Sequence, residues 1–218
     1  ESDDSSILIS RLYGKESSLN TRLANQKDGL GVVSHDVDTG REKRVEAPDK
    51  DTFGYIADSN GVVRIKGTGN ATARGYSKDT LAYFYREQGS QRWQPLSRAE
   101  IDSQTVDGFE PHAVDAAGNV VYGFDYGDRG FTNLYSIALD GSLAKSLVLS
   151  AEGADVDDLV TIGRRQRVIG ASFATEKRLV KYFDPGLRDL AVALGNALPG
   201  QPMVNFVGAS EDERKLLI

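Results

Sequence analysis

The sequence predicts an all-β chain: an arc of about four four-stranded antiparallel propeller blades, with one short inserted helix near 185–198. Three observations lead to this prediction. β-Type runs recur between clusters of Gly, Asp, Asn and Ser. A turn-plus-strand unit repeats at about the length of a propeller blade. One segment alone carries apolar residues at helical spacing.

Alternating or continuous runs of apolar and β-branched residues mark the expected strands. They are Ile7–Tyr13, Gly31–Val37, Val62–Lys66, Leu81–Arg86, Trp93–Leu96, Val120–Asp125, Leu134–Leu139, Arg167–Phe173, Leu179–Phe183, Met203–Val207 and Lys215–Ile218. Residues typical of tight turns separate them. Gly40 and Gly141 are expected in the left-handed conformation that closes a hairpin, and Asn60-Gly61 and Ala117-Gly118-Asn119 are expected to close two more.

The segment after Asp184 changes to helical spacing, which places five apolar side chains on one face. These are Leu187, Leu190, Ala191, Leu194 and Leu198. Asp184 is the expected N-cap, and Pro185 suits the first helical position because its missing N–H would be unpaired there. Pro199-Gly200 is expected to end the helix. We expect the apolar face to pack on a blade.

The repeated unit is a polar turn followed by an apolar or aromatic strand. It occurs at Ser2–Ile9, Ser77–Tyr83, Asp115–Tyr122 and Ser210–Leu217, with a weaker copy at Gly163–Ile169. The strands that begin at residues 81, 120, 167 and 215 lie 39, 47 and 48 residues apart, which is the length of a four-stranded blade. A two-sheet β-sandwich is the alternative. It explains the turns but not the repeat.

Composition disfavours several function classes. The 218 residues contain 26 Lys and Arg against 32 Asp and Glu, a net charge of −6, whereas a phosphate-binding face needs clustered positive charge. We therefore expect no nucleic-acid partner and a solvated turn at Arg164–Arg167. The apolar runs are too short to span a bilayer, so no membrane partner is expected. The chain has no cysteine, which excludes disulfides, thiolate metal sites and a cysteine nucleophile.

Several stretches resemble the propeller of bacterial prolyl oligopeptidase-family peptidases. They are Phe109–His112, Asp115–Tyr122 and Thr132–Tyr135. Lys181–Pro185 with the helix and Leu198–Gly200 is similar to one subgroup of that family, and Gly54–Asp58 with Trp93 fits the same subgroup.

The resemblance implies a non-catalytic module. In the family, a propeller covers a C-terminal α/β-hydrolase domain that carries the catalytic Ser, Asp and His, and limits access to short peptides. Residues 1–218 are then expected to be a single partial propeller cut from a longer chain, without the hydrolase. Its partners would be that hydrolase domain and, in the whole protein, a short peptide. The cut edges would favour self-association. The resemblance also suggests a bacterial protein, periplasmic or cytoplasmic, with export favoured. The rival interpretation is a non-enzymatic TolB-type propeller that serves as a protein-interaction scaffold.

No residue is assigned a catalytic, cofactor or metal role. Two serines superficially match a Gly-x-Ser-x-Gly nucleophile turn, but Ser172 lies in a strand pattern and Ser210 leads into a hairpin turn. The two histidines, His35 and His112, have surface or packing contexts rather than the paired context of a catalytic base.

Three other segments partly match known binding motifs. Asp155–Asp158 lacks the spacing of a calcium loop and is interpreted as an acidic connecting loop. Gly67–Thr72 lacks the Lys of a phosphate loop and is interpreted as a loop between strands. The aromatic group of Trp93 and Tyr83–Tyr85 is expected to pack between blades rather than stack on bases.

Overall fold

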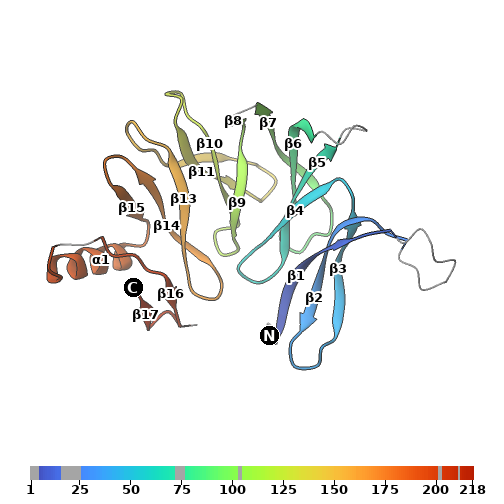
Figure 1. Ribbon diagram of the computed structural model, residues 1–218, viewed down its shortest axis with the longest axis horizontal. Coiled ribbons are helices and arrows are strands. Elements are labelled where there is room, and N and C mark those ends of the chain that lie inside the picture. Colours follow the sequence, from blue (N-terminus) through green and yellow to red (C-terminus); the bar gives the residue numbers. More distant parts are fainter. Residues whose placement is uncertain (1–4, 16–25, 72–76, 103–104, 201–202, 211) are drawn as a thin grey trace. The chain divides into compact units, whose positions relative to one another are not determined.

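The structure, a computed structural model, describes residues 5–15, 26–71, 77–102, 105–200, 203–210 and 212–218 (Figure 1). It confirms the all-β class, because every regular element of these residues is a strand except one helix. The strands form antiparallel sheets in which chain neighbours pair. Residues 1–107 and 108–218 form two compact units. One propeller domain over 1–218 stays a prediction.

The first sheet of unit 1 contains β1 (Ser6–Tyr13), β2 (Gly29–Asp36) and β3 (Glu42–Asp49), in that order. Its central strand β2 contributes the buried pair Val32 and Val33. The β2–β3 turn forms as predicted. Gly40 has φ +69°, and Asp36 Oδ1 accepts the backbone N–H groups of residues 38 and 39 at 3.0 and 2.9 Å.

The second sheet of unit 1 has five strands in chain order. They are β4 (Thr52–Ala57), β5 (Val63–Ala71), β6 (Ser77–Tyr85), β7 (Gln94–Asp102) and the short β8 (Thr105–Asp107). Val63, Ile65, Tyr83, Tyr85 and Ala99 form its buried apolar positions.

The predicted loop at Gly67–Thr72 is wrong as far as Ala71, because those residues belong to β5; Thr72 lies outside the described residues. Glycine is needed there for a reason other than a loop. A Cβ at Gly67 would come within 2.5 Å of Phe53 Cζ, so the missing side chain makes room for that ring. Phe53 in turn meets Tyr83 edge to face, with ring centroids 5.9 Å apart.

Unit 2 begins with a sheet of four strands, the number expected for a blade. These are β9 (Glu110–Asp115), β10 (Val120–Tyr126), β11 (Thr132–Ala138) and β12 (Lys145–Leu149), each paired with its chain neighbour. Two of them, β10 and β11, match the strands predicted at Val120–Asp125 and Leu134–Leu139. Asn119 takes the left-handed conformation in the β9–β10 turn (φ +49°), and Gly141 takes it in the β11–β12 turn (φ +92°). Val121 and Leu134 are fully buried.

The next sheet contains β13 (Val156–Ile162), β14 (Arg167–Ala174) and β15 (Arg178–Tyr182). The prediction of an acidic loop at Asp155–Asp158 is wrong, because β13 begins at Val156. Val156 is fully buried against Phe124 and Leu134, whereas Asp157 and Asp158 face solvent. The burial of Val156, rather than the acidity of its neighbours, decides the structure of this segment, and the irregular register between Val156 and Asp158 leaves two consecutive aspartates exposed.

The helix α1 (Pro185–Ala197) has the predicted beginning and a near match to the predicted end. Asp184 is the N-cap, and its Oδ1 accepts the Leu187 N–H at 3.1 Å. Only part of the predicted apolar face packs on the unit. Leu187 and Ala191 contact a core cluster of Ile162, Ile169, Tyr182 and Phe206, whereas Leu190 and Leu198 remain 38% and 44% exposed.

The strand predicted at Met203–Val207 is wrong, since regular pairing begins only with β16 (Gly208–Ala209) and β17 (Leu216–Leu217). Val204 and Phe206 are buried between exposed neighbours, so the segment has the side-chain alternation of a strand. Within this segment only the Val207 N–H extends the β16–β17 ladder, by donating to the Leu217 carbonyl at 2.9 Å. The Tyr182 hydroxyl donates to the Val204 carbonyl at 2.9 Å, which takes the place of a ladder bond.

The cap of α1 predicts a dependence of stability on pH. The Leu187 N–H, and secondarily Arg167, hold the pKa of Asp184 below its usual value despite partial burial. The unfolded Asp, with a pKa of about 3.9, therefore binds protons before the folded one. The stability from Asp184 is complete above that value and is lost as pH falls through the folded pKa.

Urea midpoints measured by circular dichroism between pH 7 and 2.5 check this. Asp184→Asn should lower the midpoint at pH 7 and reduce its fall in acid. Asp189→Asn is the control, because this exposed carboxylate of the same helix caps no amide. Parallel acid curves for Asp184→Asn and the wild type would contradict the prediction.

Candidate functional site

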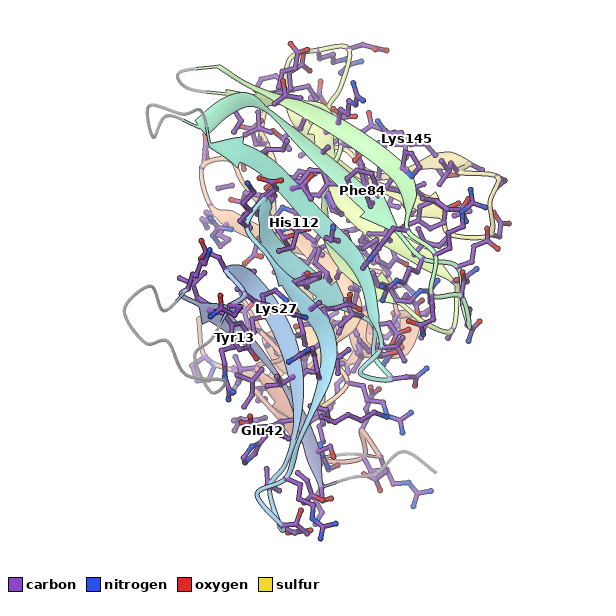
Figure 2. All side chains as sticks on the ribbon, turned by 90° about the vertical axis from the view of Figure 1, so that its right-hand side faces the viewer. Tyr13, Lys27, Glu42, Phe84, His112 and Lys145 are labelled. Atoms are coloured by element: carbon purple, nitrogen blue, oxygen red, sulfur yellow. The ribbon has the colours of Figure 1, made fainter. Side chains whose placement is uncertain are left out.

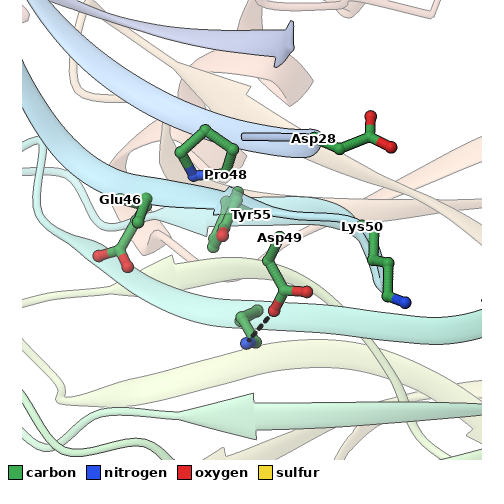
Figure 3. Close-up of a pocket in the computed structure, with 8 residues that line it drawn as sticks. Asp28, Glu46, Pro48, Asp49, Lys50 and Tyr55 are labelled. Carbon is green, nitrogen blue, oxygen red and sulfur yellow. Dashed lines mark hydrogen bonds and ion pairs between the residues drawn. The ribbon is translucent and has the colours of Figure 1, made fainter. Parts of the chain in front are cut away.

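An open hollow of about 550 Å³ lies in unit 1, where the end of β3 meets β4 and β5 (Figure 3). Its lining is mostly charged: Asp28, Glu46, Ala47, Pro48, Asp49, Lys50, Tyr55 and Lys66. Strand β3 supplies Glu46, Ala47, Pro48 and Asp49, and Asp28 lies just before β2, which pairs with β3. Figure 2 places Lys27 and Tyr13 at this end of the first sheet and Glu42 at the other.

Glu46 is the only β3 residue that is buried, and it pairs with Arg86 immediately after β6. Two hydrogen bonds join them, Nη1 to Oε1 and Nη2 to Oε2, the second at 3.1 Å. The guanidinium also stacks on Trp93, with its central carbon 3.8 Å from the ring centroid. A buried carboxylate needs such a partner, because desolvation of an unpaired charge is costly.

A second ion pair crosses the hollow from β3 to β5. Lys66 Nζ lies 3.0 Å from Asp49 Oδ2, and the Asp51 N–H donates to Oδ1 at 3.1 Å (Figure 3). Partial burial opposes ionisation of Asp49, but the hydrogen bonds from Lys66 and Asp51 outweigh it, and its pKa lies below the usual range. Both inner carboxylates of the hollow, Glu46 and Asp49, therefore have cationic partners.

Tyr55 from β4 presents a phenol to the same hollow. Burial raises its pKa above the usual value, and the carboxylates of Glu46 and Asp49 add to the rise against the opposing effects of Thr52 and Arg86. At neutral pH Tyr55 is a neutral hydroxyl that both donates and accepts hydrogen bonds.

Two charged groups at the end of the hollow have no such partners. Asp28 and Lys50 are exposed and make no hydrogen bond or ion pair with any residue that the structure describes. Figure 3 shows them at the end opposite Glu46. Gly29, at φ +105°, holds the two strands close here, since a Cβ on it would lie 2.2 Å from the Asp49 carbonyl carbon.

Ser172 lies inside strand β14, as the sequence predicts, and is 5% exposed. Its hydroxyl donates to Asp157 Oδ1 at 2.8 Å and accepts from Arg178 Nη1 at 2.9 Å. Arg178 also forms two 2.8 Å bonds with the Asp157 carboxylate. The cluster ties three strands together, and it contains no histidine to act as a base.

Ser210 lies in the β16–β17 turn, also as predicted. Its hydroxyl donates to Asp212 Oδ1 at 2.7 Å and accepts the Lys215 N–H at 3.0 Å. Both bonds close the hairpin, so this hydroxyl is committed to a turn.

Neither histidine forms a hydrogen bond with Ser172 or Ser210. His35 Nδ1 is 3.5 Å from Glu42 Oε1, a carboxylate that Arg11 already holds. His112 meets Phe124 edge to face at 4.8 Å and lies 4.0 Å from Glu110 Oε1. Neither histidine has the serine contact that a catalytic base requires.

The basic cluster at Arg164–Arg167 is divided between a turn and an ion-pair network. Residues 164–166 form the exposed β13–β14 turn, closed by the Gln166 N–H on the Gly163 carbonyl at 3.2 Å. Arg167 binds Glu213 through two bonds of 3.0 and 2.5 Å and Asp184 at 3.3 Å. It therefore joins β14, the helix N-cap and the β16–β17 turn.

A metal-ligand cluster, a membrane-spanning helix and an exposed aromatic platform have no counterpart among the described residues. No group of three or more metal-ligating side chains occurs among them. No helix in the same ranges has the length and apolar content to cross a membrane. Tyr83 and Tyr85 are 4% and 2% exposed, so they pack in the core of unit 1 and offer no stacking platform.

Comparison with family models, curated proteins and solved structures found no match to this chain.

The hollow is the feature that sequence reasoning missed. Strand β3 reads Glu-Lys-Arg-Val-Glu-Ala-Pro-Asp and lacks the apolar alternation that marks a strand. The one available signal was local: Gly29 and Asp49-Lys50-Asp51 bracket the hairpin in which β2 pairs with β3.

Two glutamates of β3 provide a matched test of the buried pair. The Glu46 and Arg86 side chains are 10% and 11% exposed, whereas the Glu42 and Arg11 side chains are 36% and 40% exposed. Glu46→Ala should cost about 3 kcal/mol, because it leaves a buried guanidinium without its anion. Glu42→Ala should shift the urea midpoint far less. Equal shifts of the urea midpoint in the two variants would contradict the prediction that the buried Glu46–Arg86 pair matters more for stability than the exposed Glu42–Arg11 pair.

Proposed function

We propose that this chain is a propeller module of a serine peptidase similar to the prolyl oligopeptidase family, with a gating and substrate-orienting role and no catalysis of its own. One observation carries the proposal. Antiparallel sheets follow one another along the chain, each joining chain neighbours, and the sheet β9–β12 has the four strands of a blade. Three of the family motifs, Phe109–His112, Asp115–Tyr122 and Thr132–Tyr135, lie in this same part of the chain.

The hydrogen bonds of the candidate serines support a role without catalysis. A nucleophilic Ser needs an adjacent base and an exposed hydroxyl. Ser172 is buried, and the Asp157 carboxylate that accepts its hydroxyl proton is a weak base, because the hydrogen bond from Arg178 lowers the pKa of Asp157. Ser210 donates to Asp212 within a turn. Any catalytic serine would therefore come from elsewhere in the parent protein.

Fluorophosphonate labelling tests the proposal. The 218-residue chain should take up no label and hydrolyse no short peptide. The product of the complete gene should be labelled at a serine outside these residues, and mass spectrometry of the tryptic peptides should locate it.

Two other outcomes would contradict the proposal. A complete gene product that takes up no label and cleaves no peptide would favour the TolB-type scaffold and overturn the peptidase proposal. Labelling at Ser172 or Ser210, lost in Ser172→Ala or Ser210→Ala, would overturn the absence of catalysis in this module.

A further inference from the structure

The charged groups of the hollow fall into an inner, paired set and an outer, free set. Inside, Glu46 pairs with Arg86 and Asp49 with Lys66. At the opposite end from Glu46, Asp28 and Lys50 have no partner among the described residues (Figure 3). One free carboxylate and one free ammonium thus remain for a ligand.

The backbone keeps these two free groups on neighbouring strand ends. Leu30 pairs with Asp49 in the β2–β3 register, and Gly29 approaches the peptide between residues 49 and 50 so closely that a Cβ would lie 2.3 Å from the Lys50 nitrogen. Asp28 and Lys50 are therefore each one residue from a fixed backbone contact. A site whose groups are held before binding costs less to order when a ligand arrives.

The charge balance of the hollow selects against simple ions. Three carboxylates, Asp28, Glu46 and Asp49, line the hollow with two cations, Lys50 and Lys66. Arg86 lies outside the lining and neutralises Glu46, Lys66 neutralises Asp49, and Asp28 and Lys50 remain as one charge of each sign. The field has no net sign to attract an anion or a cation alone. A ligand with both charges can pair with Asp28 and Lys50 together, and the Tyr55 hydroxyl offers a further neutral donor and acceptor in the lining.

The volume and lining set the size and polarity of that ligand. About 550 Å³ lies within the range of small-molecule sites, roughly 300–1,000 Å³. Most such sites are apolar, whereas this lining is predominantly charged. It suits a small polar molecule rather than an apolar one.

We propose that this hollow binds a small zwitterion of the amino-acid or dipeptide class, with the ligand carboxylate on Lys50 and the ligand ammonium on Asp28. The inference goes beyond the propeller function and does not depend on it, because it uses only residues of unit 1. Binding involves no bond formation or cleavage.

Intrinsic fluorescence can report the binding. Trp93 is the only tryptophan of the chain, and its ring lies 5.9 Å from Lys66 Nζ and 3.8 Å from the guanidinium carbon of Arg86. Titration with L-Ala-L-Ala at neutral pH and constant ionic strength should change the Trp93 emission along a saturating curve. Titration calorimetry on the same samples should give the same Kd.

Blocked dipeptides separate the two contacts. N-acetylation removes the ammonium and C-terminal amidation removes the carboxylate, and each should weaken binding on the order of tenfold by removing one charged hydrogen bond. Asp28→Asn should abolish the preference for Ala-Ala over the N-acetyl form only. Lys50→Gln should abolish the preference over the amide only.

Matched controls come from the far end of the same hairpin. Asp38→Asn and Lys43→Gln make the same chemical changes at exposed positions of the β2–β3 hairpin and should leave every Kd unchanged. The proposal is overturned if Ala-Ala gives no saturable signal up to tens of millimolar, or if either blocked form binds as well as Ala-Ala. It is also overturned if the control variants weaken binding as much as Asp28→Asn and Lys50→Gln.

Discussion

An aspartate side chain that accepts backbone N–H groups two to four residues ahead closes hairpin after hairpin in this chain, and the sheets depend on it. Asp36, Asp58, Asp115, Asp140 and Asp212 all make this contact, at 2.9 to 3.1 Å. Strands that pair with their chain neighbours must reverse within a few residues, and the turn leaves amides without ladder partners. The carboxylate satisfies them, and a residue at positive φ completes the reversal.

Ion pairs then fix how the strands and turns of each unit hold together. In unit 1, Arg64 is 1% exposed and donates to the Arg86 carbonyl at 2.8 Å, with Asp58 Oδ2 at 3.4 Å, so a buried guanidinium joins the β4–β5 turn to the end of β6. In unit 2, Arg167 joins β14 to the helix N-cap and the last turn. For the buried Arg64–Asp58 pair, removal of one partner is costly because it leaves an uncompensated buried charge, whereas the partly exposed Arg167 pairs contribute less.

The hollow is formed by the same two kinds of interaction, hairpin closure and ion pairing. The β2–β3 hairpin places Asp28 and Lys50 at neighbouring strand ends, and the Glu46–Arg86 pair with its Trp93 stack fixes the inner wall. The serines, by contrast, are committed to hydrogen bonds that hold strands and turns. The recognition chemistry that we propose therefore lies with the charged groups of unit 1.

The sequence by itself determined the all-β class, the turns at Gly40 and Gly141 and the beginning of α1 at Asp184, because turn and cap preferences act over two to four residues. Only the tertiary structure decided which polar segments are strands. Strand β3 has almost no apolar pattern and exists through its pairing with β2, and the Val204–Phe206 segment has the pattern without the pairing. The hollow was equally beyond local reasoning, since Asp49 and Lys66 meet across 17 positions and Glu46 and Arg86 across 40. Pairing between distant segments is set by burial and register, and neither can be calculated from neighbours in the sequence.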